Sequence, residues 1–344
     1  MVANPAYTVH AADVERDREL ILGLWRGNLG DESRMARKYD WFYRECPYGA
    51  PLTLLLRHEE SGAWVGVATA GPRQMMLGGK LVQAGVLVDL AVLPAHRSLF
   101  PALSLQMALM EAGSKRFELM YGFPNPKAAA VFKRVGYVPL CKLVRHARVV
   151  RHGGYVRRRL PAPLAWPAGL LLDAVDHLRL TGRRAGTRGE WLDQADETLS
   201  SLWSPDRAGD GPVSIRDLTF LRWRFDQSPL VDVRYLLVRG RDGTPLAWFA
   251  CESREGILYV HDFWAARGVA GPSRAEVATL LRCARDGGHT AVSIELGAAA
   301  AGDGLLGNGF VPREPRPVFW HPCGETLEAV APADLWLTAA DEDE

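Results

Sequence analysis

The sequence predicts an α+β fold, in which a mixed central sheet is flanked by helices, and it predicts that this fold occurs twice in tandem. Three observations lead to this prediction: the chain length, the alternation of helix-like and strand-like segments, and landmarks that recur in the same order. The 344 residues correspond to about two domains of ordinary size. With 48% hydrophobic and 24% charged residues, the composition is that of a globular, water-soluble protein.

Four short motifs occur once in each half of the chain. They are Leu24-Trp25 with Leu202-Trp203, Trp41–Pro47 with Trp223–Pro229, Val88–Leu90 with His261–Phe263, and Gly136–Pro139 with Gly309–Pro312. The last two pairs are separated by the same number of residues, so they share one gapless register. Coincidence in a chain rich in Ala, Arg and Leu is the alternative, but a duplicated domain explains the order and the register better.

The first half begins with two helices and a hairpin. Apolar spacing predicts helices at Val14–Asn28 and Glu32–Arg44, and the Pro47–Pro51 cluster ends the second one. Alternating apolar residues then predict strands at Leu52–Arg57 and Trp64–Ala70, joined by a turn that contains Gly.

A buried strand that leads into a helix follows. The run Val86–Leu93 is apolar except for Asp89, which is typical of a central strand buried on both faces. Pro94–Ser98 is predicted as a loop, Pro101–Ala112 as a helix, and Phe117–Tyr121 as the next strand.

The last part of the first half is a short helix and a returning strand. Lys127–Val135 is predicted to be helical and to end at Gly136, which suits the left-handed position after a helix. Tyr137–Val150 is predicted as one or two strands. The second half repeats this order with strands at Tyr235–Val238, Leu246–Glu252, Ile257–Trp264 and Ala291–Leu296, a helix at Arg274–Arg285, and the Gly309-Phe310 landmark.

These elements divide the chain into four parts. Residues 1–150 form the first domain, 151–195 an Arg-rich helical connector, 196–335 a second, degenerate copy, and 336–344 an acidic tail. The favoured interpretation of the connector is a helical linker packed between the domains. Contact between its Arg-flanked apolar helix, Leu164–Leu180, and an anionic membrane surface is a less favoured alternative.

Composition also restricts the partners and the compartment. A formal net charge of +1 gives no field that would favour binding to nucleic acid. The five cysteines are scattered without a C-x-x-C pair, which predicts neither a disulfide framework nor a metal site, and fits a reducing cytoplasm. We expect neither a signal peptide nor a transmembrane helix.

The transition from strand to helix after Val88 is the most informative segment for function. The first turn of a helix carries unpaired backbone N–H groups and the positive end of the helix dipole, which suits a phosphate or pyrophosphate. Arg97 adds a positive charge, Ser98 is placed to cap the helix, and Pro101 suits its first turn. An ordinary strand-to-helix turn with a surface arginine is the alternative.

With these residues in place, the first half resembles the GNAT superfamily, the GCN5-related N-acetyltransferases. The pyrophosphate motif of that superfamily, Arg/Gln-x-x-Gly-x-Gly/Ala, matches Arg97–Ala102. A later family segment, Asn-x-x-Ala followed by an aromatic residue and Gly-Tyr/Phe, matches Asn125, Ala128, Phe132 and Gly136-Tyr137. The resemblance covers about residues 5–145 and is weaker in the second half, where no comparable loop is found.

The resemblance implies a site for acetyl-CoA or a longer acyl-CoA as the acyl donor. In this family the central strand is splayed, so that backbone N–H groups can bind the thioester carbonyl and the pantetheine arm. The donor-binding residues implied in this way are Leu90, Ala91, Val92, Arg97, Ser98, Leu99, Phe100, Pro101, Ala102, Asn125 and Phe132.

Two of these residues depart from the family pattern. Phe100 replaces the central glycine of the loop, which in the family lets the backbone approach the pyrophosphate. Phe132 stands near the position where the family often has a tyrosine beside the leaving thiol, and it has no proton to donate.

Asp89 is the main candidate for a general base. A lone carboxylate in an apolar strand has its pKa raised by burial, towards a range useful for accepting a proton. The alternative is a structural Asp at a strand kink, and the counterpart Asp262 in the second half favours that alternative.

Aromatic residues complete the candidate site. Tyr121 is a second candidate catalytic residue, and Trp41 and Tyr43, together with Asp262, are candidates for the acceptor side. Packing in the core is the favoured alternative for the aromatic side chains.

The sequence as a whole therefore predicts an enzyme, an acyl-CoA-dependent N-acyltransferase whose small-molecule acceptor carries the amine of an amino sugar or an amino acid. Double GNAT-like chains include Fem-type transferases and enzymes of polysaccharide biosynthesis, and the acceptor is expected to enter between the halves. Two alternatives stay open: a binding or assembly protein that kept the fold without its chemistry, and an acyltransferase that takes its acyl group from acyl carrier protein, docked by the Arg-rich connector.

Overall fold

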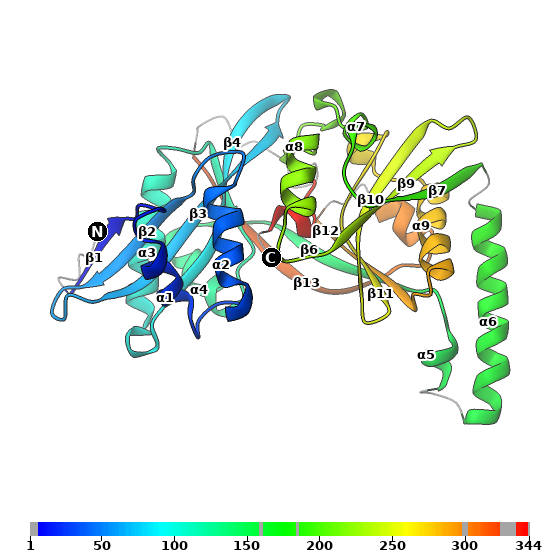
Figure 1. The fold of residues 1–344 in the computed structure, drawn as a ribbon, viewed down its shortest axis with the longest axis horizontal. Helices are drawn as coiled ribbons and strands as arrows, with labels where there is room; N and C mark the ends of the chain where they lie inside the picture. The colour runs from blue at the N-terminus through cyan, green and yellow to red at the C-terminus, as the bar shows by residue number, and fades with distance from the viewer. Residues whose placement is uncertain (1–5, 158–160, 184–185, 298–301, 324–334, 343–344) are drawn as a thin grey trace.

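We analysed a computed structural model of the chain, in which residues 6–157, 161–183, 186–297, 302–323 and 335–342 are described (Figure 1). One mixed sheet of 13 strands runs through the described part of the molecule, and helices cover it. This arrangement confirms the predicted fold class.

The first half contains six strands and four helices in the described part. The strands are β1 (Tyr7–Ala11), β2 (Leu52–His58), β3 (Trp64–Leu77), β4 (Lys80–Val92), β5 (Leu119–Gly122) and β6 (Val138–Val149), and the helices are α1 (Arg18–Trp25), α2 (Glu32–Tyr39), α3 (Leu99–Gly113) and α4 (Pro126–Val135). A π-helical turn, Asp40–Arg44, continues α2, and a 3-10 turn, Pro94–His96, precedes α3.

The remainder of the chain consists of the connector, with helices α5 and α6, and the second half. The helices are α5 (Gly153–Arg157), α6 (Ala162–Arg183), α7 (Glu197–Ser200), α8 (Leu218–Leu221), α9 (Arg274–Asp286) and α10 (Gly302–Leu306), and the strands are β7 (Thr187–Leu192), β8 (Val213–Ser214), β9 (Val233–Gly240), β10 (Pro245–Arg254), β11 (Ile257–Ala265), β12 (Ala291–Leu296) and β13 (Val311–Pro322). A second π-helical turn, Arg222–Asp226, continues α8, and 3-10 turns lie at Pro205–Arg207, Gly268–Ala270 and Ala339–Asp341.

The order of the strands in the sheet is symmetric about its centre. It runs β1-β2-β3-β4-β5-β13-β6-β12-β11-β10-β9-β7. The two halves exchange their last strands, because β13 inserts beside β5 of the first half and β6 pairs with β12 of the second half. The division at residue 150 stays a prediction, since the sheet continues across it without a break.

The two π-helical turns meet at this centre of symmetry. Trp41 Nε1 donates to the carbonyl of Trp223 at 2.7 Å, and Trp223 Nε1 donates to the carbonyl of Trp41 at 3.2 Å. The two indole rings are stacked, with their centroids 5.0 Å apart. Because both side chains are buried and pair with each other, packing accounts for the recurrence of this motif in the sequence.

Alternating side chains of the first-half strands enter two separate cores. Val67, Val86 and Val88 pack with α1 and α2 on one face of the sheet. Ala68 and Leu87 pack with α3 and α4 on the other face. This alternation follows from the two-residue period of a strand. It shows that β3 and β4 are covered on both faces, as had been predicted for the run Val86–Leu93, which overlaps β4.

Some predicted boundaries shift in the structure. Strand β1 was not predicted, and β3 and β4 extend towards each other as a long hairpin that closes at Gly78 and Gly79. The predicted end of α4 is confirmed, because Gly136 follows it in the left-handed conformation with φ of 111°.

Helix α6 lies at the outer edge of the molecule, beside α9, and not between the two halves (Figure 1). Two carboxylates hold it there: Asp176 pairs with Arg148, and Asp173 pairs with Arg285 at 3.5 Å. None of the described helices, α6 included, combines the length and apolar character needed to cross a bilayer.

Candidate functional site

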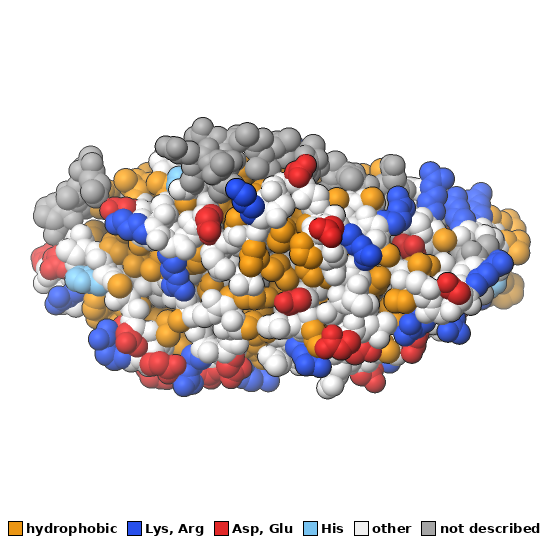
Figure 2. Space-filling model, turned by 90° about the horizontal axis from the view of Figure 1, so that it is seen from above, with side chains coloured by type: hydrophobic (Ala, Val, Ile, Leu, Met, Phe, Trp, Pro, Cys, Tyr) orange, Lys and Arg blue, Asp and Glu red, His pale blue; other side chains and the backbone are white. Residues whose placement is uncertain are grey.

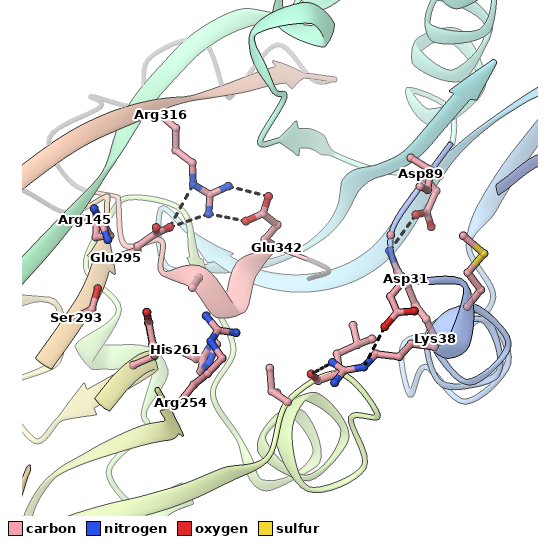
Figure 3. A pocket seen from close by; sticks show the side chains of 18 of the residues that line it. Asp31, Lys38, Asp89, Arg145, Arg254, His261, Ser293, Glu295, Arg316 and Glu342 are labelled. Carbon is pink, nitrogen blue, oxygen red and sulfur yellow. Dashed lines mark hydrogen bonds and ion pairs between the residues drawn. The ribbon is translucent and has the colours of Figure 1, made fainter. Parts of the chain in front are cut away.

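A cavity of about 700 Å³ lies between the two halves on the α1–α2 face of the sheet (Figure 3). Cavities of this size are typical of sites for small molecules. One wall comes from α1, α2 and the bulge of β4, and the other from β6, β10, β11, β12 and β13. The lining side chains include Trp25, Asp31, Arg34, Met35, Lys38, Asp89, Arg145, Leu230, Arg254, Tyr259, His261, Ser293, Glu295, Arg316 and Glu342.

Asp89 reaches this cavity because β4 is interrupted at that residue. Between Val67 and Thr69 the register of β3 with β4 shifts, so that Asp89 and Leu90 both face Ala68. Asp89 has φ of 52°, a left-handed conformation that Asp and Asn tolerate better than most residues.

Two partners hold the Asp89 carboxylate. Lys38 Nζ lies 3.0 Å from Oδ1, and the Tyr43 hydroxyl donates to Oδ2 at 2.8 Å. The Tyr43 hydroxyl is also hydrogen-bonded to Thr69 Oγ1 at 2.8 Å. The Asp89 side chain is only 4% exposed and that of Lys38 13%, so the pair is shielded from bulk water and opens only into the cavity.

Strand β4 separates from its parallel neighbour next to Asp89. Its pairing with β5 covers Ala84–Leu87 against Leu119–Gly122, and β5 ends there. Beyond Leu87, β4 pairs with β3 alone among the described strands. Leu90, Ala91 and Val92, the predicted carbonyl-binding residues, lie in this separated part.

Helix α3 begins directly after the separated strand. Ser98 occupies the N-cap position, but its side chain makes no capping hydrogen bond. The first turn contains Leu99, Phe100, Pro101 and Ala102, and Pro101 has no N–H group to donate. Outward-pointing N–H donors are therefore expected at Leu99 and Phe100.

Arg97 is turned towards the end of β4. Its Nε donates to the carbonyl of Val92 at 3.1 Å, and its guanidinium also bonds the side-chain oxygen of Asn28. The Arg97 side chain is exposed, and the residue directly precedes Ser98, the N-cap of α3.

The corresponding helix in the second half has a closed N-terminus. Ser273 accepts from the N–H of Glu276, and the Glu276 side chain accepts from the N–H of Ser273, which completes a capping box before α9. The side chains of Ser273 and Glu276 thus bond to backbone N–H groups at the start of α9, whereas the start of α3 has no side-chain cap. This difference agrees with the absence of a family-type loop from the sequence of the second half.

Asp262, the counterpart of Asp89, is fully buried in an ionic network. Arg216 Nε lies 2.9 Å from Asp262 Oδ2, and Arg216 Nη2 lies 3.2 Å from Asp341 Oδ2. Thr338 donates its hydroxyl to Asp262 at 2.8 Å. Burial and the nearby Asp341 carboxylate raise the pKa of Asp262 to about 6, against the opposing effect of Arg216.

The C-terminal segment, residues 335–342, builds this network and had not been assigned such a role from the sequence. Its Thr338 bridges to Leu296 of β12, and the N–H of Gly297 donates to the carbonyl of Leu337 at 2.8 Å. The segment therefore fills the space where β11 separates from β12. Its Ala339 and Glu342 also line the cavity, so a stretch predicted as an acidic tail forms part of the site.

Three other predicted site residues serve as structural supports. Asn125 caps α4 by accepting from the N–H groups of Lys127 and Ala128. Phe132 is buried against Tyr137 and Phe319. Tyr121 is buried away from the cavity, where burial raises its pKa, and its hydroxyl donates to the carbonyl of Asp341.

Opposite Asp89, the cavity has a polar floor made by four adjacent strands (Figure 3). Arg145, Ser293 and His261 come from β6, β12 and β11, and Arg254 from β10 lies over the Tyr259 ring at 4.5 Å. The His261 ring is hydrogen-bonded to Glu252 at 2.9 Å, which holds the pKa of Glu252 below its ordinary value.

Three arginines and three glutamates meet at this end of the cavity, so its formal charge is balanced, and only the pairing of these groups is uneven. Both acidic residues near the centre, Glu295 and Glu342, pair with Arg316. In the described part of the chain, no ion pair joins Arg145 to an acidic side chain, and the contact of Arg254 with Glu252 is 3.6 Å long. The sequence had not indicated these two arginines, because they are far apart along the chain.

The sequence matches no protein-family model and no curated protein. Its structure is similar to that of a conserved protein of unknown function from Enterococcus faecalis V583, described as a probable N-acyltransferase (TM-score 0.66, 10% identity, 92% of this chain and 73% of that one). It is also similar to a GCN5-related N-acetyltransferase from Kribbella flavida (TM-score 0.62, 14% identity, 92% and 72%). Saccharomyces cerevisiae N-myristoyltransferase with bound myristoyl-CoA is a further match (TM-score 0.53, 12% identity, 94% and 84%). The chain thus has the fold of the GCN5-related N-acetyltransferases.

Proposed function

We propose that this protein is an acyl-CoA-dependent N-acyltransferase whose donor and acceptor meet at Asp89. The observation that carries the proposal is the position of this carboxylate. It stands at the bulge of a strand that separates from its neighbour, opens into a 700 Å³ cavity, and lies shortly before a helix with an uncapped N-terminus.

In this proposal the donor binds along the separated part of β4. The CoA pyrophosphate lies at the N-terminus of α3, where backbone N–H groups and Arg97 offset its charge. The thioester carbonyl accepts from backbone N–H groups among Leu90, Ala91 and Val92, which stabilises the negative charge that develops on its oxygen.

The acceptor enters through the cavity and places its amine beside Asp89. The amine nitrogen bonds to the thioester carbonyl carbon, the carbon–sulfur bond breaks, and CoA leaves as a thiolate. The proton released by the nitrogen passes to Asp89, and the thiolate takes its proton from solvent. Lys38 and Tyr43 hold the carboxylate in position for this transfer.

Thermal unfolding with CoA, acetyl-CoA and a long-chain acyl-CoA tests the donor site. We expect ligand at 100 times its Kd to stabilise the protein by about 2.7 kcal/mol, seen as a higher Tm. Arg97→Glu should abolish this shift, because it places a negative charge beside the pyrophosphate. As a matched control, Arg234→Glu reverses an exposed charge in the second half and should leave the shift unchanged.

The absence of any shift with all three ligands would exclude the CoA site. It would favour a binding protein without chemistry, for which Phe100 in the loop and Phe132 in place of the family tyrosine are the relevant departures. A rise in Tm without release of CoA in the presence of amines would support the donor site and contradict the proposed role of Asp89 in catalysis.

We further propose that the acceptor is of the amino-acid type and not a neutral amino sugar. Arg145 and Arg254 lie across the cavity from Asp89. An amino acid can therefore place its amine beside Asp89 and its carboxylate near these arginines. Charge-assisted hydrogen bonds between arginine and a carboxylate are among the strongest in proteins.

A panel of amines, assayed by release of the CoA thiol, tests this acceptor class. Amino acids should be acylated with a kcat/KM about 10- to 100-fold higher than that of their methyl esters, as expected for a hydrogen bond to a charged group. Arg145→Met should remove this preference and leave the rate with the esters unchanged. Equal rates with acids and esters, or a preference for amino sugars, would contradict the proposal.

A further inference from the structure

Helix α6 packs against the body of the protein with a largely polar side, to which Leu180 adds a buried apolar side chain near the end of the helix. Asp173 and Asp176, the two carboxylates of the helix, both face inward and pair with Arg285 and Arg148. His177, on the same side, is hydrogen-bonded to Arg282. Both acidic side chains of the helix thus form ion pairs that attach it to the rest of the protein.

The outward side of α6 is apolar and open to solvent. Leu178 is 72% exposed, Leu171 67% and Trp166 64%. The full set of exposed large apolar side chains on the helix is Leu164, Trp166, Leu170, Leu171, Leu172, Val175 and Leu178. This distribution is the reverse of that expected for a surface helix, whose apolar side faces the core. Contiguous exposed apolar surface of this kind marks an interaction site.

The apolar surface is too broad for pairing with one other helix. Consecutive residues of a helix point about 100° apart, so Leu170, Leu171 and Leu172 together cover about 200° of its circumference. A two-stranded coiled coil buries a narrow seam, with two apolar positions in every seven. A planar, extended apolar partner accounts for the width better than a second helix does.

Exposed arginines flank this surface, and the acidic groups of α6 itself do not face it. Arg157, Arg179, Arg183 and Arg188 are exposed on α5, α6 and β7, while the acidic groups of α6 face inward. Figure 2 shows basic side chains beside apolar ones at this end of the molecule. Trp166 and Tyr155, which is 48% exposed, are aromatic residues of the kind that lies at the boundary between water and lipid.

We propose that α6 binds the surface of an anionic lipid bilayer, lying in the plane of the interface with its leucines among the acyl chains. The arginines then meet the lipid phosphates and acidic headgroups. The helix does not cross the bilayer, and the remainder of the protein stays on the aqueous side. This inference does not depend on the proposed acyltransferase activity.

Co-sedimentation of the full chain with vesicles tests the proposal. We expect binding to vesicles of phosphatidylcholine with 30% phosphatidylglycerol to exceed binding to pure phosphatidylcholine by about tenfold, and to fall as the salt concentration rises. The double variant Leu171→Glu/Leu178→Glu should lose at least nine-tenths of the binding. Arg157→Glu/Arg179→Glu should lose the preference for anionic vesicles.

The matched control is Leu81→Glu on the hairpin between β3 and β4, where a leucine is 54% exposed far from α6. This variant should sediment like the unmodified protein. Because all the altered side chains are exposed, each variant should retain its Tm, and this is measured in parallel.

Two results would overturn the proposal. One is sedimentation that is the same for anionic and neutral vesicles, or that is unaffected by the two glutamates on α6. The other is a dimer in light scattering that Leu171→Glu/Leu178→Glu converts to a monomer, because a second copy of the chain would then cover the helix.

Discussion

Replacing Asp89 by asparagine is expected to lower kcat/KM for N-acylation by about 10²- to 10⁴-fold, the usual contribution of a positioned general base. The variant keeps the shape of the side chain, and asparagine tolerates the left-handed backbone at this bulge. The asparagine amide can still accept a hydrogen bond from Tyr43, whose hydroxyl also bonds to Thr69, but it cannot take up a proton from the amine. Release of the CoA thiol measures the rate, and Tm with acetyl-CoA confirms that donor binding persists.

The control for this variant is Asp31→Asn, which changes a carboxylate in the same cavity wall that caps α2 and lies apart from the separated strand. We expect its rate to stay within about twofold of the unmodified protein. If Asp89→Asn has full activity, Asp89 is a structural residue of the bulge and the proton is accepted elsewhere.

Replacing Arg216 by methionine is expected to lower the free energy of unfolding by about 3–5 kcal/mol. Arg216, Asp262 and Asp341 are all fully buried, and Arg216 pairs with both carboxylates. Its loss leaves these two groups close together in the core with no compensating charge. Chemical denaturation measures the change, and Arg234→Met, which removes an exposed ion pair with Asp193, should cost less than about 1 kcal/mol.

The deficit of Arg216→Met should depend on pH in a defined direction. Without the arginine, the folded-state pKa of Asp262 rises further above its value in the unfolded chain, so the folded state binds more protons than the unfolded one. The free energy of unfolding therefore falls as the pH rises through about 4 to 6 and beyond. A deficit that is the same at pH 4 and pH 8 would show that the two carboxylates are not left unpaired and charged.

The sequence alone determined the local elements around the site. The strand at Asp89, the turn after it, helix α3 and the end of α4 at Gly136 follow from apolar periodicity and from turn residues, which act over a few positions of the chain. The recurring motifs also indicated the repeated order of elements. Leu90–Val92 and Arg97–Ala102 lie at the separated strand and the open helix N-terminus, although their role in binding CoA stays a prediction.

Only the tertiary structure distinguished Asp89 from Asp262. Both stand at matching positions in apolar strands, so the sequence offers no local difference between them. The C-terminal segment packs against β11 and buries Asp262 with Arg216, whereas the space beside Asp89 remains open to the cavity. The placement of Arg145 and Arg254 in one cavity, on β6 and β10, and the inward turn of the α6 carboxylates were decided in the same way. Contacts between residues far apart along the chain, such as Arg216 and Asp341 at 125 positions, depend on how the whole chain packs, and local periodicity carries no record of that packing.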